Sequence, residues 1–227
     1  MIKPIIFNTD MVRAILDGRK TVTRRVCKDG DDYTVPDMGF YDADKRTYAV
    51  HSFADREHTD SLGTAERTCP ICPGDILWVR ETWEVFRTYP SIFGVDVLYA
   101  ADQFINSCIF QDMNRYLEKF LKYEEKKGWN TPYSMPKEAA RIWLKVTGVR
   151  VEPLWSITEE QAKAEGANWK DGKNARGEEK MRRSAVERFA EIWNSTIKKP
   201  DLSRYGWEAN PWVWVIGFER CEKPEGA

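Results

Sequence analysis

The sequence predicts an α+β fold in which short strands form a small mixed β-barrel and helices flank it. Short apolar runs with strand character recur along the chain, the connections between them are uneven in length, and helical patterns lie between them. A doubly wound sheet would instead show a regular alternation of strand and helix. The 227 residues contain no internal repeat and no low-complexity segment, so a repeat architecture is not expected.

The N-terminal region is predicted to form a strand and a helix that ends in a basic run. Residues 5–7 are apolar, and Asn8-Thr9-Asp10 after them is typical of a helix N-cap. Residues 12–16 place their apolar side chains on one helical face, and Gly18 predicts the end of the helix. The run GRKTVTRR, residues 18–25, then contains four basic side chains and two threonine hydroxyls within eight residues. Cations are favoured at a helix C-terminus, which explains part of this charge.

The middle of the chain is expected to contain two insertions around clear strands. Residues 28–72 are polar and weakly periodic, with Thr47 to Val50 as a candidate short strand. Residues 76–80 follow a Pro-Gly-Asp turn and predict a buried strand, with Val95 to Ala100 as its antiparallel neighbour. Residues 113–127 predict an amphipathic helix that is added to the fold.

The C-terminal third predicts two strands and two helices. Residues 141–151 alternate as a strand that is interrupted at Gly148. Residues 158–165 begin with Thr158 and two glutamates, which is an N-terminal helix signal. Residues 181–193 are the clearest helix, and residues 212–218 are apolar on both faces, which indicates a central or barrel-closing strand.

Length and composition favour one cytoplasmic domain. We expect a single domain over residues 1–227, with insertions at about 28–72 and 102–135. The formal charge of −1 gives no argument for duplex nucleic acid, although local basic patches are compatible with it. No signal-peptide pattern and no long apolar run is present, so we expect neither secretion nor a membrane partner. The five cysteines are an odd number, which favours reduced thiols.

Several common catalytic and metal-binding patterns are missing. Cys69 and Cys72 have the spacing of half a zinc site, but only His51, His58 and Cys27 could complete it and no second C-x-x-C exists; Pro73-Gly74 follows at once, so a tight turn also explains the pair. Phosphate-binding and dinucleotide-binding glycine motifs are absent. We therefore expect no metal and no cofactor, and any catalysis has to use lysine, hydroxyl and carboxylate groups.

The basic run resembles the signature of the ASCH domains, G-x-K-x-x-[E/T]-x-R, within the PUA-like superfamily. Three further segments resemble that family in the same order. Residues 73–79 match its turn and strand, residues 158–166 its short helix, and residues 212–219 its closing strand. The ending YGWEANPW, residues 205–212, is similar to the long ASCH proteins of phages and prophages. The resemblance implies a PUA-like barrel for most of the chain outside the two insertions.

The resemblance also implies an activity. Small bacterial ASCH enzymes hydrolyse N(4)-acetylcytidine to cytidine with a Lys, a Thr and a Glu, and these match Lys20, Thr23 and Glu165 here. Many ASCH domains carry Glu at the position of Thr23, so the threonine favours the amidohydrolase branch. Each residue also has an ordinary alternative: Lys20 as a helix-end cation, Thr23 as a β-branched strand residue, and Glu165 as a surface charge at a helix end.

Further side chains are expected on the substrate side of this site. An aromatic ring would stack on the pyrimidine, with core packing as the alternative for each aromatic residue. Glu81 would line the pocket or be an exposed charge at a strand end, and Arg24 is expected, like Arg25, to be a substrate-side or solvated charge. The predicted substrate-side residues are Arg25, Glu81, Trp83, Tyr205 and Trp207.

Two other functions are compatible with the same sequence. One is a PUA-like RNA- or DNA-binding module without hydrolysis, which would use residues 19–25 to contact phosphates. The other is a ribonuclease. The hydrolase hypothesis takes a small nucleoside as its partner, with RNA as the larger form of the substrate, and requires Lys20, Thr23 and Glu165 to converge in a concave pocket.

Overall fold

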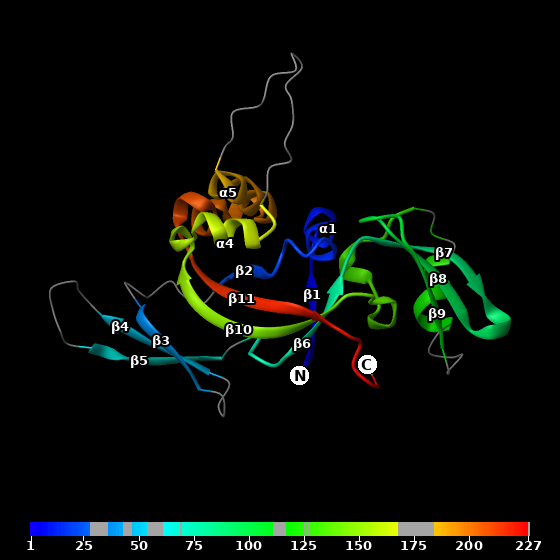
Figure 1. Cartoon of the computed structure of the whole chain (residues 1–227), viewed down its shortest axis with the longest axis horizontal. Coiled ribbons are helices and arrows are strands. Elements are labelled where there is room, and N and C mark those ends of the chain that lie inside the picture. Colours follow the sequence, from blue (N-terminus) through cyan, green and yellow to red (C-terminus); the bar gives the residue numbers. More distant parts are fainter. Residues whose placement is uncertain are drawn as a thin grey trace, which may run out of the picture. The chain divides into compact units, whose positions relative to one another are not determined.

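The computed structural model describes residues 1–27, 36–42, 47–53, 61–68, 70–110, 117–124, 126, 128–167 and 184–226. The chain divides into two compact units. The first unit comprises Met1–Lys20, Gly74–Lys145 and Phe218–Ala227, and the second comprises Thr21–Pro73 and Val146–Gly217. Strands and helices occur in both, so the fold is α+β, as the sequence predicts (Figure 1). Among the described strands the pairings close no sheet into a barrel, and the barrel stays a prediction.

The first unit begins with a parallel strand pair. β1 (Ile2–Ile6) pairs in parallel with β6 (Ile76–Arg80), and the start of β10 (Trp143–Pro153) pairs antiparallel with the other edge of β6. The predicted neighbour of β6 was therefore wrong. Residues 95–100 fall largely in β8 (Gly94–Tyr99), which pairs with β7 (Trp83–Tyr89) and β9 (Ile105–Ile109) instead. The reason is local, because the short turn at Pro90–Ile92 folds β8 directly back onto β7.

The helix predicted at 113–127 is only partly confirmed. A π-helical turn at Leu117–Leu121 leads into the short helix α3 (Lys122–Glu124), and residues 111–116, 125 and 127 lie outside the described residues. The segment is also no addition to the fold. Phe120 is fully buried and lies edge-on to the Trp83 ring, with 6.1 Å between centroids, so this segment supplies part of the core of the first unit.

α1 (Thr9–Leu16) confirms the predicted N-terminal helix. The Asn8 side chain accepts a hydrogen bond from the backbone N–H of Met11, as an N-cap residue does. Gly18 follows the helix with a φ of 72°, a left-handed conformation that glycine adopts at little cost. The predicted start and end of this helix are therefore both correct.

The second unit is built on three strands. β2 (Val22–Val26) pairs antiparallel with β11 (Trp212–Cys221), from Val22↔Gly217 to Val26↔Val213, and β10 lies on the other side of β11. β11 is thus a central strand, and its residues from Val213 to Ile216 are buried, as expected for a strand that is apolar on both faces.

Two helices cover one face of these strands (Figure 1). α4 (Glu159–Ala164) has the predicted start, with Thr158 and Gln161 forming a capping box. α5 (Ala185–Thr196) is capped by Ser184 and Glu187 and buries Phe189 and Trp193. The Glu159 carboxylate also accepts hydrogen bonds from the first backbone N–H groups of α5, which fixes the two helices against one another.

The polar insertion contains more regular structure than the sequence predicts. β3 (Pro36–Asp42), β4 (Thr47–Phe53) and β5 (Ser61–Thr68) form an antiparallel sheet, and β4 includes the strand predicted at Thr47 to Val50. None of the described helices of the protein is long and apolar enough to cross a membrane.

The C-terminal motif around Gly206 is hydrogen-bonded to α5. α6 (Leu202–Tyr205) ends at Gly206, and the Trp207 N–H after it donates to Asn194 Oδ1 on α5 at 2.8 Å. A Cβ added to Gly206 would lie 2.4 Å from the carbonyl oxygen of Leu202. The position therefore requires glycine for space, although its φ of −68° is open to any residue.

We predict that Gly206→Ala lowers the free energy of unfolding by about 1–3 kcal/mol, because the added methyl group forces the backbone of α6 to shift. Urea unfolding followed by circular dichroism measures this change. Gly148→Ala is the matched control, since a Cβ at Gly148 meets nothing within 4 Å. A Gly206→Ala protein as stable as the control would contradict the packing described for this turn.

Candidate active site

The basic run connects the end of α1 to β2. After Gly18 the chain turns sharply, and the backbone N–H groups of Arg19 and Lys20 both donate to the carbonyl oxygen of Ala14, at 2.8 and 2.9 Å. Arg19 remains exposed and pairs with Asp17, with 2.7 Å between Nη2 and Oδ2. Arg19 is therefore the solvated helix-end cation that the dipole favours.

Lys20 differs from Arg19 because its side chain is buried. Only 2% of Lys20 is exposed, and its Nζ lies 5.6 Å from the centre of the Phe7 ring within the first unit. A buried ammonium group is costly unless other groups compensate for its lost hydration. Lys20 is therefore not a solvated cation at the helix end.

Thr23 lies in the middle of β2 and is also buried. It is 2% exposed and stands opposite Ile216 of β11. Successive side chains of a strand point to opposite faces, so Thr23 and Arg24 leave β2 on different sides. Within the part of the chain that the structure describes, no hydrogen bond joins Thr23 to Glu165.

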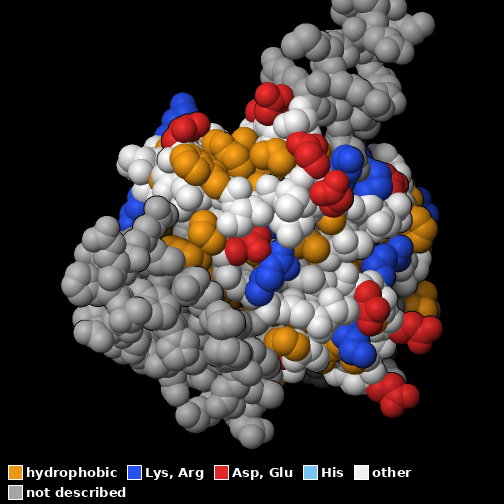
Figure 2. All heavy atoms as spheres, turned by 60° about the vertical axis from the view of Figure 1, so that its left-hand side comes forward, with side chains coloured by type: hydrophobic (Ala, Val, Ile, Leu, Met, Phe, Trp, Pro, Cys, Tyr) orange, Lys and Arg blue, Asp and Glu red, His pale blue; other side chains and the backbone are white. Residues whose placement is uncertain are grey.

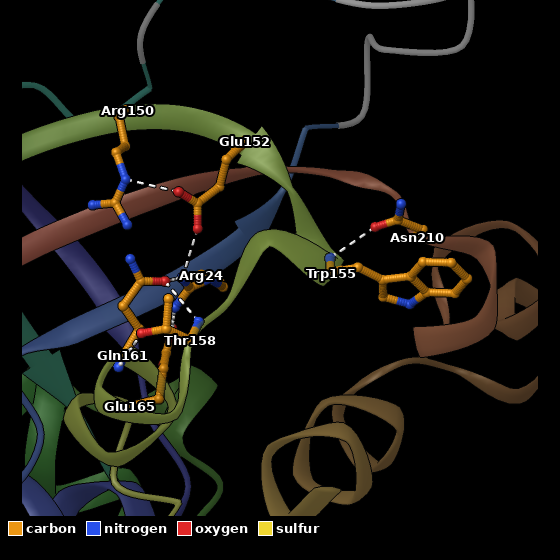
Figure 3. Close-up of polar contacts among 8 residues, drawn as sticks. All are labelled: Arg24, Arg150, Glu152, Trp155, Thr158, Gln161, Glu165 and Asn210. Atoms are coloured by element: carbon orange, nitrogen blue, oxygen red, sulfur yellow. Dashed lines mark hydrogen bonds and ion pairs between the residues drawn. The ribbon is translucent and has the colours of Figure 1, made fainter. Parts of the chain in front are cut away.

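Arg24 of β2 donates a hydrogen bond to Glu165 (Figure 3). Its Nη1 donates to Glu165 Oε1 at 3.1 Å, and its Nη2 donates to Glu152 Oε1 at 2.6 Å and to Gln161 Oε1 at 2.7 Å. The guanidinium carbon lies 5.8 Å from the centre of the Phe189 ring. The expectation that Arg24 is a solvated or substrate-side charge was wrong, because its side chain is fully buried among these groups.

Glu165 is buried at the end of α4 rather than exposed on the surface. It caps the helix C-terminus and is 6% exposed. The helix dipole disfavours a carboxylate at this end, and the Arg24 guanidinium supplies the positive charge that offsets it. Glu165 is therefore not a surface charge at the helix end.

Arg25 lies on the same face of β2 as Thr23 and is half-buried. Burial lowers the pKa of the Arg25 guanidinium, and the negative charge of Glu165 acts in the opposite direction. Glu165 thus influences both arginines of the strand.

A backbone hydrogen bond joins the basic run to α4. The N–H of Thr21 donates to the carbonyl oxygen of Ala164 at 2.9 Å, within the second unit. Thr21 follows Lys20 in the chain, and Ala164 precedes Glu165. Within the second unit, β2 with Thr23 and the end of α4 with Glu165 are therefore linked by main-chain as well as side-chain contacts.

Glu81 lies in the first unit and is neither exposed nor unpaired. It is 1% exposed, and both its oxygens accept hydrogen bonds from Arg141, from Nε and Nη2 at 2.9 Å each. Arg141 Nη1 also pairs with Asp102 Oδ2 at 2.8 Å, and the guanidinium carbon of Arg141 lies 4.0 Å from the centre of the Tyr99 ring. Burial raises the pKa of Glu81, and the hydrogen bond and charge of Arg141 oppose this shift.

The aromatic residues predicted on the substrate side make packing and hydrogen-bond contacts. Trp83 is fully buried in the first unit, with its ring centre 4.9 Å from that of Tyr123, so it offers no free face to a base. In the second unit the carbonyl oxygens of Tyr205 and Trp207 accept hydrogen bonds from indole N–H groups, those of Trp193 and Trp155 respectively, at 2.8 Å each. Core packing, the alternative for these aromatics, describes Trp83 fully and Trp207 in part, because the Trp207 ring lies edge-on to the Phe189 ring.

No group of three or more His, Cys, Asp or Glu side chains that could hold a metal ion occurs among the described residues. Cys72 is buried, and Cys69 lies outside the described residues.

No family model, no curated protein and no solved structure matches this chain. The ASCH resemblance therefore rests on the sequence segments themselves.

We predict that Arg24→Met lowers the free energy of unfolding by about 3–5 kcal/mol, because it leaves two carboxylates without their buried counter-charge. Arg150→Met is the matched control. Arg150 donates to the other oxygen of Glu152 at 2.8 Å but is 49% exposed, so its loss should change stability by no more than about 1 kcal/mol. Equal and small effects of the two substitutions in urea unfolding would contradict the buried cluster.

Proposed function

We propose that this protein is an amidohydrolase that removes the N(4)-acyl group, in particular acetyl, from acylated cytidine on a PUA-like barrel. Lys20, Thr23 and Glu165 are the proposed catalytic residues, as the ASCH resemblance implies. No metal and no cofactor takes part in this proposal.

The observation that carries the proposal is the hydrogen bond from Thr21 to Ala164. Consecutive Cα atoms are about 3.8 Å apart, so Glu165 is one residue from a backbone group that this bond fixes within the second unit. The ion pair between Arg24 and Glu165 joins the same two segments. These contacts support the association of residues that are far apart in the sequence, on which the hydrolase hypothesis depends.

The proposed reaction consumes one water and yields cytidine and a carboxylate. Thr23 Oγ1 attacks the acyl carbonyl to form an acyl-threonine ester, which the water hydrolyses once the amine has left, or Thr23 positions the water to attack the carbonyl directly. In both routes neutral Lys20 accepts the proton of the attacking group. The C–N bond then breaks, and Glu165 holds the exocyclic nitrogen and relays a proton to the departing amine. The leaving group is the amino group of a heteroaromatic ring, which departs more readily than an alkylamine, so this step does not demand a metal ion.

The burial of Lys20 and Arg24 weighs against the use of the basic run as a phosphate-binding surface. Lys20 and Arg24 are at most 3% exposed, and Arg19 is paired with Asp17. On the face drawn in Figure 2, lysine and arginine side chains of the described residues are interspersed with acidic ones. Phosphate contacts depend on accessible cations, so these observations favour the hydrolase over the nucleic-acid-binding alternative.

We expect the purified protein to release cytidine and acetate from N(4)-acetylcytidine, and Lys20→Ala or Thr23→Ala to lower kcat/KM by at least about 100-fold. Liquid chromatography of the nucleosides measures the reaction. Thr21→Ala and Glu160→Gln are matched controls, because both side chains are exposed and close in sequence to the proposed site.

Activity that survives both catalytic substitutions would exclude this site. An intact nucleoside, together with RNA binding that weakens steeply with salt, would instead support the binding-module alternative. RNA cleavage that persists through stringent purification would support the ribonuclease.

A further inference from the structure

Arg24 has no part in the proposed reaction, yet its guanidinium donates hydrogen bonds to Glu165, Glu152 and Gln161. We propose that Arg24 is a positioning residue that fixes the carboxylate of Glu165 for catalysis. This inference rests on the proposed function and adds a residue that the ASCH signature leaves unspecified.

The geometry of the guanidinium supports this role. Nη2 is held by two acceptors on two elements, Glu152 on β10 and Gln161 on α4. A guanidinium is planar and rigid, so fixing Nη2 also fixes the direction in which Nη1 points. Nη1 donates to Glu165 Oε1, and the position of that oxygen is thereby set by three elements, β2, β10 and α4.

The surroundings of the pair make this geometry hard to change. The Arg24 side chain is 0% exposed and that of Glu165 is 4% exposed. The Phe189 ring lies 5.8 Å from the guanidinium carbon. In such a dry setting an ion pair is poorly screened, and separating it would break a charge-assisted hydrogen bond away from water. The carboxylate should therefore keep one orientation rather than exchange among several.

Arginine is suited to positioning and unsuited to proton transfer. Its guanidinium stays protonated in proteins, so Arg24 cannot act as the acid or the base of the reaction. Lysine carries the same charge but only one nitrogen, without the planar fork that reaches three acceptors. Arg24→Lys therefore keeps the charge and removes the geometry, which separates the two contributions.

The test measures hydrolysis of N(4)-acetylcytidine by the full-length wild type, Arg24→Lys, Glu165→Gln and the double variant. We expect Arg24→Lys to lower kcat by about 10- to 100-fold, as a displacement near 1 Å can, and to change KM by less than about threefold. The double variant should be no slower than Glu165→Gln alone, because both substitutions disable the same carboxylate. Arg150→Lys, at the exposed partner of Glu152, should behave as wild type.

Circular dichroism and thermal unfolding at the assay temperature ensure that only folded protein is compared. If Arg24→Lys is unfolded there, Glu152→Gln takes its place, since it removes one charge that holds Nη2 and is expected to lower kcat by about threefold or more.

Three outcomes would overturn the inference. An active wild type with an unchanged kcat in Arg24→Lys, or in Glu152→Gln where that variant replaces it, would assign Arg24 a structural role only. Losses that multiply in the double variant would show that Arg24 does not act through Glu165. A wild type that releases no cytidine would overturn the proposed function and this inference with it.

Discussion

The second unit depends on one buried guanidinium. Arg24 gathers Glu152, Gln161 and Glu165 around a single charge, and these residues come from β10 and α4, far from β2 in the chain. Hydrogen bonds to charged groups are stronger than neutral ones, and leaving such groups buried without a partner is costly. The association of β2, β10 and α4 is therefore coupled, because one guanidinium on β2 bonds to groups of both other elements.

The short helix α4 shows why this interaction matters for the site. A helix of six residues is not stable by itself in water. Three sets of contacts hold it: the capping box of Thr158, the bonds from Glu159 to the start of α5, and the pairing of Gln161 and Glu165 with Arg24. The position of Glu165 is thus a consequence of tertiary contacts rather than of helix propensity.

Local patterns in the sequence predicted most of the elements that frame the site. The caps at Asn8 and Thr158 and the apolar run of β11 follow from short-range chemistry, and each is confirmed. The pairing of β8 and the burial of Arg24 were missed, because strand partners and side-chain direction depend on register with distant segments. The sequence did contain one indication that an arginine of this strand is buried. Two adjacent arginines lie between Val22 and Val26, and because side chains alternate along a strand, one of them must point to the covered face.

The central claim is that Arg24 and Glu165 stabilise the protein as a pair, and a double-mutant cycle in urea tests it most directly. The free energies of unfolding of wild type, Arg24→Met, Glu165→Gln and the double variant give the interaction energy of the two side chains. The buried ion pair predicts a favourable coupling of about 1–3 kcal/mol, with the double variant losing less stability than the sum of the single variants. Strictly additive losses would show that the two side chains act independently, and would contradict this account.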